Sequence, residues 1–326
     1  MTDPRPEAQV VLRLDNITKR FGKLTANDAI SFDLRQGEVI ALLGENGAGK
    51  TTLMNILFGH YTPDEGHVEV FGQRLPAGNP RAALAAGVGM VHQHFALADN
   101  MTVLENIVLG TRSIWRPGFG RAQARQRIVT LMEDYGLRVD PDAQVGSLSV
   151  GERQRVEILK ALYREARILI LDEPTAVLTP QETDDLFATM RKAVALGLSV
   201  IFISHKLHEV MAISSRVVVL RHGKLVAEAK TSETDRAAMA QMMVGSEVAA
   251  PVVRRADPGA ALVTLAGVSS PDIGSAPGLK YVDLELRAGQ ITGLAGVSGN
   301  GQTALADLIG GLIRPASGRF HVKGDA

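Results

Sequence analysis

The chain has 326 residues, of which 45% are hydrophobic and 21% are charged, a composition typical of a folded globular protein rather than a disordered or collagen-like one. Lysine plus arginine and aspartate plus glutamate both number 35, so the formal net charge is zero and provides no general attraction to nucleic acid or to an anionic membrane surface. There are no cysteines, which excludes disulfides, cysteine-ligated metal sites and a thiol nucleophile. At about 150 residues per domain, the length favours two domains.

Short apolar runs alternate with segments of helical spacing. Residues 12–17 and 29–34 alternate apolar and polar side chains, which predicts an antiparallel β layer. Later runs are continuously apolar, which predicts parallel strands buried on both faces. These runs are Val39–Leu43, Val88–Val91, Ile168–Leu171, Val200–Ile203 and Val217–Leu220. The predicted helices are Thr51–Phe58, Arg121–Tyr135, Gly151–Tyr163, Pro180–Ala195 and Leu207–Ala212. This alternation of strands and helices predicts an α/β domain.

The sequence repeats part of itself at a constant offset of 252 residues. Residues 40–53 read IALLGENGAGKTTL and align with residues 292–305, which read TGLAGVSGNGQTAL. A single offset predicts a second copy of one domain, since a solenoid would repeat every 20–50 residues or so. We therefore expect a first domain over residues 1–245, a linker over 246–260 and an N-terminal fragment of a degenerate second copy over 261–326, cut short in its C-terminal half.

Residues 44–51 read GENGAGKT and match the phosphate-loop pattern GxxxxGK[ST]. They follow an apolar run and precede a helical segment, which is the structural context of that loop. Glycines let backbone N–H groups approach phosphate closely, and the N-terminus of the following helix favours anions. We expect Lys50 to reach the β- and γ-phosphates and the Thr51 hydroxyl to bind Mg²⁺. The candidate nucleotide-binding residues of this segment are Gly44, Glu45, Asn46, Gly47, Ala48, Gly49, Lys50, Thr51 and Thr52.

Two carboxylates, Asp172 and Glu173, follow the apolar run Ile168–Leu171. A carboxylate at the end of a buried strand is costly unless it has a partner or a function. Asp172 can hold Mg²⁺, and Glu173 can orient and deprotonate a water molecule that attacks phosphate. Taken alone, the pair could equally cap the next helix. Ser149 and Gly151 open another predicted helix, whose N-terminus is a second potential anion site.

With the phosphate loop, three further segments closely resemble the nucleotide-binding domain of an ABC-type ATPase. They are LSVGERQ at residues 148–154, ILILDEP at 168–174 and IFISHK at 201–206. The resemblance implies a P-loop NTPase fold with an antiparallel β layer and a helical subdomain, and it implies ATP and Mg²⁺ as ligands. It also implies that Ser149 and Gly151, in a variant of the usual LSGGQ, clamp the γ-phosphate of ATP held by another domain copy.

The resemblance assigns roles to three more residues. Phe21, in ITKRFG, stands where an aromatic ring stacks on adenine, and Gln93, in MVHQHFAL, stands where a glutamine contacts Mg²⁺ and water. His205 matches a histidine that contacts the γ-phosphate and the attacking water. Judged without the resemblance, these three residues would be a core phenylalanine, a solvated loop amide and a structural histidine. Thr179 replaces the aspartate of the usual SALD segment, which puts communication between domains through that position in doubt.

Gln302 stands at the position of Lys50 in the second copy, and a neutral amide cannot supply the charge of an ammonium group. Degenerate loops of this kind resemble the C-terminal halves of fused sugar and nucleoside importer ATPases. We therefore expect the ATP-hydrolysing subunit of an ABC importer for a nucleoside or simple sugar. Its partners would be transmembrane permease subunits, a second nucleotide-binding domain in cis or in trans and, indirectly, a substrate-binding lipoprotein. It would lie peripherally on the cytoplasmic face of the inner membrane, and nucleic acid is not an expected partner.

Two alternatives remain open at the level of sequence. One is an ABC ATPase that acts on ribosomes or DNA, although such proteins usually carry two intact sites, long charged insertions or zinc-binding cysteines. The other is an unrelated P-loop kinase or GTPase. A GTPase needs an NKxD segment to read guanine, and the sequence has none.

Overall fold

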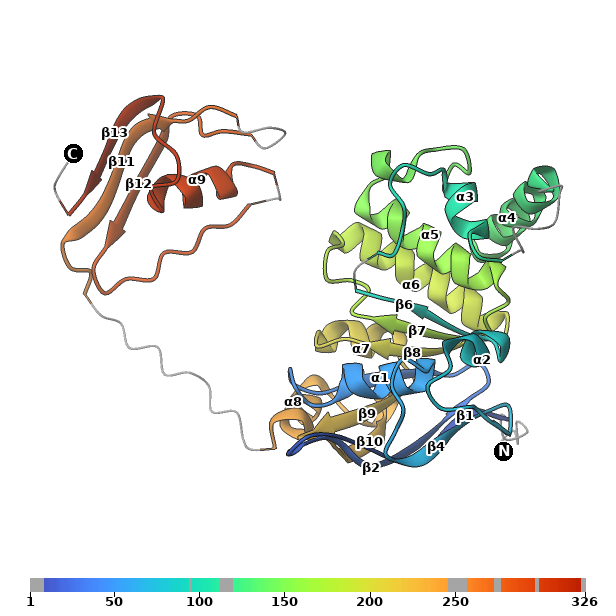
Figure 1. Cartoon of the computed structure of the whole chain (residues 1–326). Helices are drawn as coiled ribbons and strands as arrows, with labels where there is room; N and C mark the ends of the chain where they lie inside the picture. Colours follow the sequence, from blue (N-terminus) through green and yellow to red (C-terminus); the bar gives the residue numbers. More distant parts are fainter. Residues whose placement is uncertain are drawn as a thin grey trace, which may run out of the picture. The chain divides into compact units, whose positions relative to one another are not determined.

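A computed structural model of the chain describes residues 9–93, 95–111, 120–245, 257–272, 277–296 and 299–323 (Figure 1). The chain divides into two compact units, Met1–Val248 and Ala249–Ala326. The division falls within the predicted linker 246–260, of which residues 246–256 lie outside the described part of the chain. Val297 and Ser298, in the segment that aligns with the phosphate loop, lie outside it as well.

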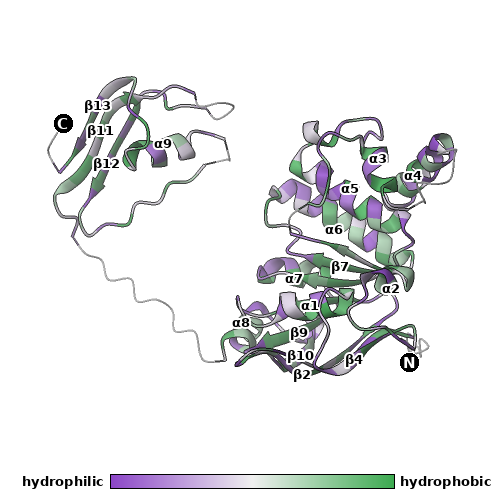
Figure 2. Cartoon of the chain, viewed as in Figure 1, coloured by the Kyte–Doolittle hydropathy of each residue, from purple (hydrophilic) through white to green (hydrophobic). Residues whose placement is uncertain are grey.

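A six-stranded sheet with the order β10-β9-β3-β8-β7-β6 forms the centre of the first unit. Strands β6, β7, β8, β3 and β9 run parallel to one another, and β10 pairs antiparallel with β9 at one edge. The five predicted apolar runs all lie in this sheet, and every residue of β3 and of β8 is buried, as expected for strands covered on both faces. Figure 2 shows β7 of this sheet largely in the hydrophobic colour. The bounds are β3 Val39–Leu43, β6 Val88–Val91, β7 Ile168–Asp172, β8 Ser199–Ile203, β9 Arg216–Arg221 and β10 Lys224–Lys230.

A second, antiparallel sheet has the order β2-β1-β4-β5. Its strands are β1 (Val10–Phe21), β2 (Leu24–Arg35), β4 (Glu65–Val70) and β5 (Gln73–Arg74). Side chains from β1, β2, β3 and helix α1 share one buried apolar cluster, which includes Leu14, Ile30, Leu42 and Leu53. The predicted antiparallel layer is therefore present, and it is longer than the two segments from which it was predicted.

All five predicted helices form, within two residues of their expected bounds. They are α1 (Lys50–Phe58), α4 (Arg121–Tyr135), α5 (Val150–Tyr163), α6 (Pro180–Ala195) and α7 (Leu207–Ile213). Three further α-helices of the first unit, within its described residues, were not predicted: α2 (Pro80–Ala85), α3 (Val103–Val108) and α8 (Arg236–Val244). Gly59 and Gly136 end α1 and α4 in the left-handed conformation that glycine adopts without strain. None of the helices in the described ranges is long and apolar enough to cross a membrane.

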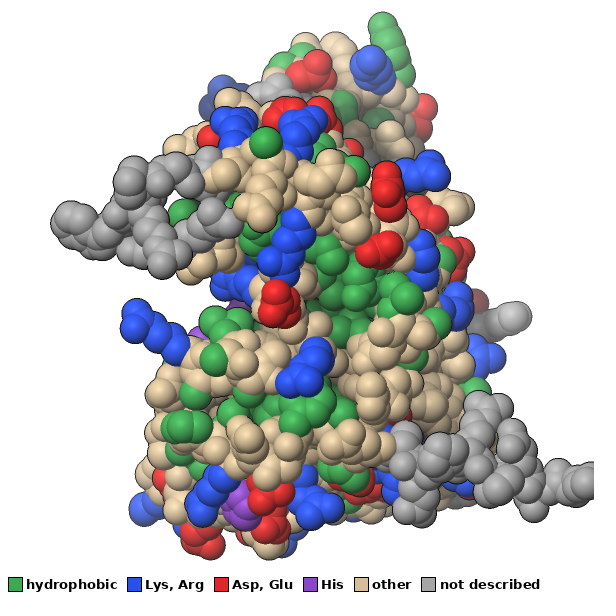
Figure 3. Space-filling model, turned by 90° about the vertical axis from the view of Figure 1, so that its right-hand side faces the viewer, with side chains coloured by type: hydrophobic (Ala, Val, Ile, Leu, Met, Phe, Trp, Pro, Cys, Tyr) green, Lys and Arg blue, Asp and Glu red, His purple; other side chains and the backbone are tan. Residues whose placement is uncertain are grey.

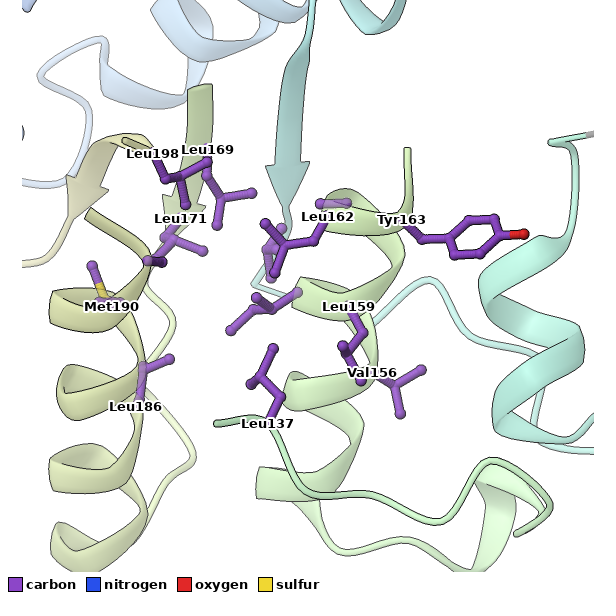
Figure 4. Close-up of a cluster of buried hydrophobic side chains, with 14 of the residues drawn as sticks. Leu137, Val156, Leu159, Leu162, Tyr163, Leu169, Leu171, Leu186, Met190 and Leu198 are labelled. Atoms are coloured by element: carbon purple, nitrogen blue, oxygen red, sulfur yellow. The ribbon is translucent and has the colours of Figure 1, made fainter. Parts of the chain in front are cut away.

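The largest apolar cluster lies between α5, α6 and β7 (Figure 4). Leu162 projects from α5 toward the side on which β7 and α6 lie, and Leu171 of β7 and Leu186 and Met190 of α6 belong to the same cluster. These contacts pack α5 against the sheet. The packing fixes the position of the helix whose N-terminus carries Ser149 and Gly151.

We expect Phe202→Ala to lower the free energy of unfolding of the first unit by about 3–5 kcal/mol, since it leaves a cavity at a completely buried site. The Phe202 ring meets Phe187 edge to face, with 6.0 Å between ring centroids. Urea unfolding of the full chain measures the loss. Leu196→Ala is the control, because that side chain is 57% exposed and should cost under about 0.5 kcal/mol. A similar small loss for Phe202→Ala would contradict this packing.

The second unit contains a three-stranded antiparallel sheet with the order β12-β11-β13. Its elements are β11 (Ala261–Ser269), β12 (Val282–Arg287), α9 (Gln302–Ile309) and β13 (Ser317–Val322). Leu265, Val268 and Leu308 form the centre of its small apolar cluster. Residues 291–296 form no strand here, and Ile291 is 99% exposed, whereas the aligned segment of the first unit is the buried strand β3.

Candidate active site

A cavity of about 660 Å³ opens where the carboxyl ends of β3 and β7 meet the turn of the β1–β2 hairpin. Eleven of the predicted site residues line it, although they come from four separate segments. They are Phe21, Asn46, Gly47, Ala48, Gly49, Lys50, Thr51, Thr52, Gln93, Asp172 and Glu173. The turn residues His222 and Gly223 line it too, and sequence analysis missed them because no motif marks that turn.

The phosphate loop has the backbone that its glycines predict. Gly44, Gly47 and Gly49 have φ values of 152°, 84° and 99°, a range that other residues rarely adopt. Gly49 directly precedes α1 and offers no side-chain cap, so the first N–H groups of that helix have no side-chain partner. Lys50 Nζ donates hydrogen bonds to the carbonyl oxygens of Gly44 (2.7 Å) and Glu45 (3.0 Å). These contacts place Gly44 and Glu45 around the ammonium group, although neither lines the cavity.

We expect Gly49→Ala to weaken MgATP binding about tenfold or more, because a left-handed backbone costs an L-residue about 1–2 kcal/mol and the added carbon also collides with the hairpin. A Cβ at Gly49 would lie 2.3 Å from the carbonyl oxygen of Ala26. Isothermal titration calorimetry measures the affinity. Gly72→Ala is the control, since Gly72 has φ 75° but open space around the new carbon and lies outside the cavity. Equal affinity in both variants would refute the steric argument.

The electrostatics of the cavity centre on one cation and two carboxylates. Lys50 is only 7% exposed, and burial lowers the pKa of its ammonium group, while the negative charges of Glu173 and Asp172 oppose that shift. Burial, followed by the charge of Glu173, raises the pKa of Asp172. The positive charge of Lys50 and the negative charges of Asp172 and Glu173 therefore stabilise one another, as expected where a cation neutralises carboxylates.

Glu173 is held in an unusual conformation. Its φ is 46°, in the left-handed region, and its N–H donates to the carbonyl oxygen of Ile203 at 3.0 Å. Its Oε1 lies 3.1 Å from Nδ1 of His205, which follows β8. Local strain of this kind costs about 1–3 kcal/mol and is concentrated at functional sites. His205 does not line the cavity directly, and it contacts the site through Glu173.

The donor atoms in the cavity fit a magnesium nucleotide. Thr51, Gln93 and Asp172 provide a hydroxyl, an amide and a carboxylate, and oxygen ligands of these types suit Mg²⁺ when phosphate oxygens share the ion. Phe21 stands at the rim with 45% of its surface exposed, and Lys19 lies 5.5 Å from its ring centroid. Phe21 is thus partly accessible to a ligand in the cavity.

Ser149 and Gly151 do not line this cavity, since they lie at the N-terminus of α5. Ser149 and Glu152 form a capping box, in which the Glu152 carboxylate accepts from the Ser149 N–H at 2.8 Å. The Glu182 carboxylate lies against Gly151 and accepts a hydrogen bond from the Thr179 N–H at 2.9 Å. The S-x-x-E and T-x-x-E spacings could have revealed both capping boxes in the sequence, but the contact between Glu182 and Gly151 carries no sequence signal.

A glycine-rich loop at the end of a central parallel strand, with a buried lysine facing carboxylates at the end of a nearby strand, defines a P-loop nucleotide-binding domain. A sequence profile of the ABC transporter family (ABC_tran) matches residues 27–176 and 279–326, which together exceed half of the chain. The chain belongs to the ABC transporter family.

Relatives and solved structures agree with this family. The glucose import ATP-binding protein TsgD13 of Haloferax volcanii is 45% identical over 96% of this chain, and the nucleoside import ATP-binding protein NupA of Lactococcus lactis subsp. cremoris is 43% identical over 97%. The chain spans 62% and 63% of the lengths of those two proteins. The crystal structure of the ADP conformation of MJ1267, an ATP-binding cassette of an ABC transporter, superposes with a TM-score of 0.64 at 26% identity and covers 73% of this chain and all of that one.

Proposed function

We propose that the first unit binds and hydrolyses MgATP and that this reaction drives uptake of a nucleoside or simple sugar through a separate membrane permease. The supporting observation is the single cavity that combines the phosphate loop and Lys50 with Asp172 and Glu173, next to His205. The import function is inferred from the relatives, which are import ATP-binding proteins for glucose and nucleosides. In this proposal the chain works at the cytoplasmic face of the membrane.

The residues divide the work of hydrolysis. The loop N–H groups and Lys50 bind the β- and γ-phosphates and meet the negative charge that develops on the transferred phosphoryl group. Glu173 accepts a proton from the attacking water as the bond to the leaving ADP oxygen breaks. His205 lies within hydrogen-bond distance of Glu173 and orients that carboxylate. Thr51, Asp172 and Gln93 would hold Mg²⁺, which would supply charge neutralisation at the phosphate oxygens.

We also propose that the second unit is a degenerate second copy of the domain. The sheet orders β2-β1-β4 and β12-β11-β13 agree, and β13 spans the residues that an offset of 252 from β4 requires. Left-handed backbone positions recur at that offset even where the residue is not glycine, which is uncommon by chance. The pairs, with their φ values, are Ala29 (48°) and Tyr281 (50°), Phe71 (49°) and Lys323 (53°), and Gly49 (99°) and Gly301 (88°).

The loop of the second unit is proposed to support little or no hydrolysis. Gln302 occupies the position of Lys50, and its Oε1 accepts a hydrogen bond from the Asn300 N–H at 3.0 Å. The neutral Gln302 side chain points into its own loop and presents an acceptor at the position where the first unit has the positive charge of Lys50.

Ser149 and Gly151 lie outside the cavity of the first unit. Their position supports the proposal that another domain copy, in cis or in trans, completes the first site.

The partners can be identified by affinity capture from detergent-solubilised membranes after chemical crosslinking, with and without MgATP. The proposal expects multi-span permease subunits, and a solute-binding lipoprotein in the same complex. Ribosomal proteins or DNA in their place would support the alternative class of ABC ATPase and overturn the importer assignment.

On the face drawn in Figure 3, basic and acidic side chains are interspersed and neither sign forms a continuous area.

A further inference from the structure

The two loops that carry Glu173 and His205 share a buried carboxylate that no motif identifies. Glu209, in the first turn of α7, is only 1% exposed. A carboxylate removed from water in this way is costly unless hydrogen bonds and a cation compensate it. Its partners therefore indicate what the residue holds together.

One partner comes from the loop after β7. The Thr175 hydroxyl donates to Glu209 Oε2 at 2.6 Å, and Thr175 is itself buried. Thr175 lies two residues after Glu173 in a short turn, in which the Ala176 N–H donates to the Glu173 carbonyl oxygen at 3.2 Å. Glu209 thus fixes the segment that determines the direction of the Glu173 side chain.

The other partners flank His205 in the loop after β8. The Ser204 hydroxyl donates to the same Oε2 of Glu209 at 3.0 Å, and Lys206 Nζ lies 3.1 Å from Oε1. Lys206 also donates to the carbonyl oxygen of Thr175 at 3.0 Å, so the lysine crosses from one loop to the other. The three contacts leave His205 between two anchored neighbours.

We propose that Glu209 is a positioning residue for ATP hydrolysis, which holds the loops after β7 and β8 in the register that sets the 3.1 Å contact between Glu173 Oε1 and His205 Nδ1. Glu209 touches neither the cavity nor the nucleotide loop, and it acts through Thr175, Ser204 and Lys206. This inference rests on the proposed ATPase function.

Glu209→Gln keeps the shape of the side chain but removes its charge and turns an NH₂ group toward other donors. We expect kcat for ATP hydrolysis to fall at least tenfold, while the dissociation constant for MgATP changes less than about twofold, because the phosphate loop is untouched. Glu233→Gln is the matched control. Glu233 pairs with Lys230 at the same i,i+3 spacing as Glu209 with Lys206, but on the surface. It should leave both quantities unchanged.

A double-mutant cycle separates positioning from a merely structural role. If Glu209 acts through the Glu173–His205 contact, Glu209→Gln should cost less than about threefold in kcat when His205→Ala is already present. Additive losses in the cycle would overturn the proposal. So would equal effects of Glu209→Gln on kcat and on MgATP affinity.

Thermal unfolding in the presence of MgATP shows whether each variant is folded at the assay temperature. Should Glu209→Gln unfold there, Thr175→Val and Thr175→Ser carry the test, because valine removes the hydroxyl that Glu209 accepts from and serine keeps it. The proposal expects the valine variant to lose kcat selectively and the serine variant to retain it, and equal behaviour of the two would overturn it. An inactive wild-type chain would instead refute the proposed ATPase function, which distinguishes the two failures.

Discussion

Glu173→Gln is expected to bind MgATP with nearly unchanged affinity and to hydrolyse it about 10²–10⁴ times more slowly, the usual contribution of a positioned general base. The amide has the size of the carboxylate but cannot accept the proton of the attacking water. Affinity should persist because the phosphate loop and Lys50 do not depend on Glu173 for their geometry: Lys50 donates to backbone carbonyl oxygens of the loop itself. Steady-state phosphate release measures kcat, and calorimetry measures MgATP binding.

The control for Glu173→Gln must test the backbone as well as the charge. Glu165→Gln does so, because Glu165 is another glutamate with a left-handed backbone, at φ 64°, and its side chain lies on the surface near Arg127. It should hydrolyse ATP at the wild-type rate. If Glu173→Gln also kept normal turnover, Glu173 would not be the base, and another group would have to accept the proton of the attacking water.

The central sheet and its main helices could be predicted because each carries a local signal. Continuous apolar runs such as Val39–Leu43 are strands buried on both faces, and Gly59 and Gly136 mark helix ends at which only glycine is free of strain. Two of the missed elements are too short to show a hydrophobic period. Helix α3 has only six residues and is stabilised by a capping box between Thr102 and Glu105 and by packing, and β5 has two residues.

The sequence predicted those residues of the candidate site that belong to a motif. Lys50, Asp172 and Glu173 lie in one cavity because the carboxyl ends of parallel strands meet at one edge of a sheet, so motifs far apart in sequence converge. Contacts made by single polar residues have no such pattern. Thr175 and Glu209 lie 34 residues apart, and only the packing of α7 against the sheet brings them together. Glu209, which we propose to position Glu173 and His205, is therefore visible only in the structure.

Lys50→Ala is expected to weaken MgATP binding by about tenfold to a hundredfold, since a charge-assisted hydrogen bond at a buried site contributes about 1.5–3 kcal/mol. Two further effects act in the same direction. The carbonyl oxygens of Gly44 and Glu45 lose their shared donor, which loosens the loop. Asp172 loses a cation that lowers its pKa, so its charged form is less favoured in a site that already raises that pKa by burial.

Lys192→Ala is the matched control for Lys50→Ala, because Lys192 Nζ also donates to a backbone carbonyl oxygen, that of Glu133 at 2.8 Å, but between α4 and α6. It should bind and hydrolyse MgATP as the wild type does. Lys50→Ala and Glu173→Gln together also test the second unit, in which Gln302 aligns with Lys50 at the offset of 252 residues. If the second unit supports no hydrolysis, Lys50→Ala in the full chain should abolish nearly all turnover. Substantial turnover that survives both Lys50→Ala and Glu173→Gln would have to arise at the second loop, and it would contradict the assignment of that loop as degenerate.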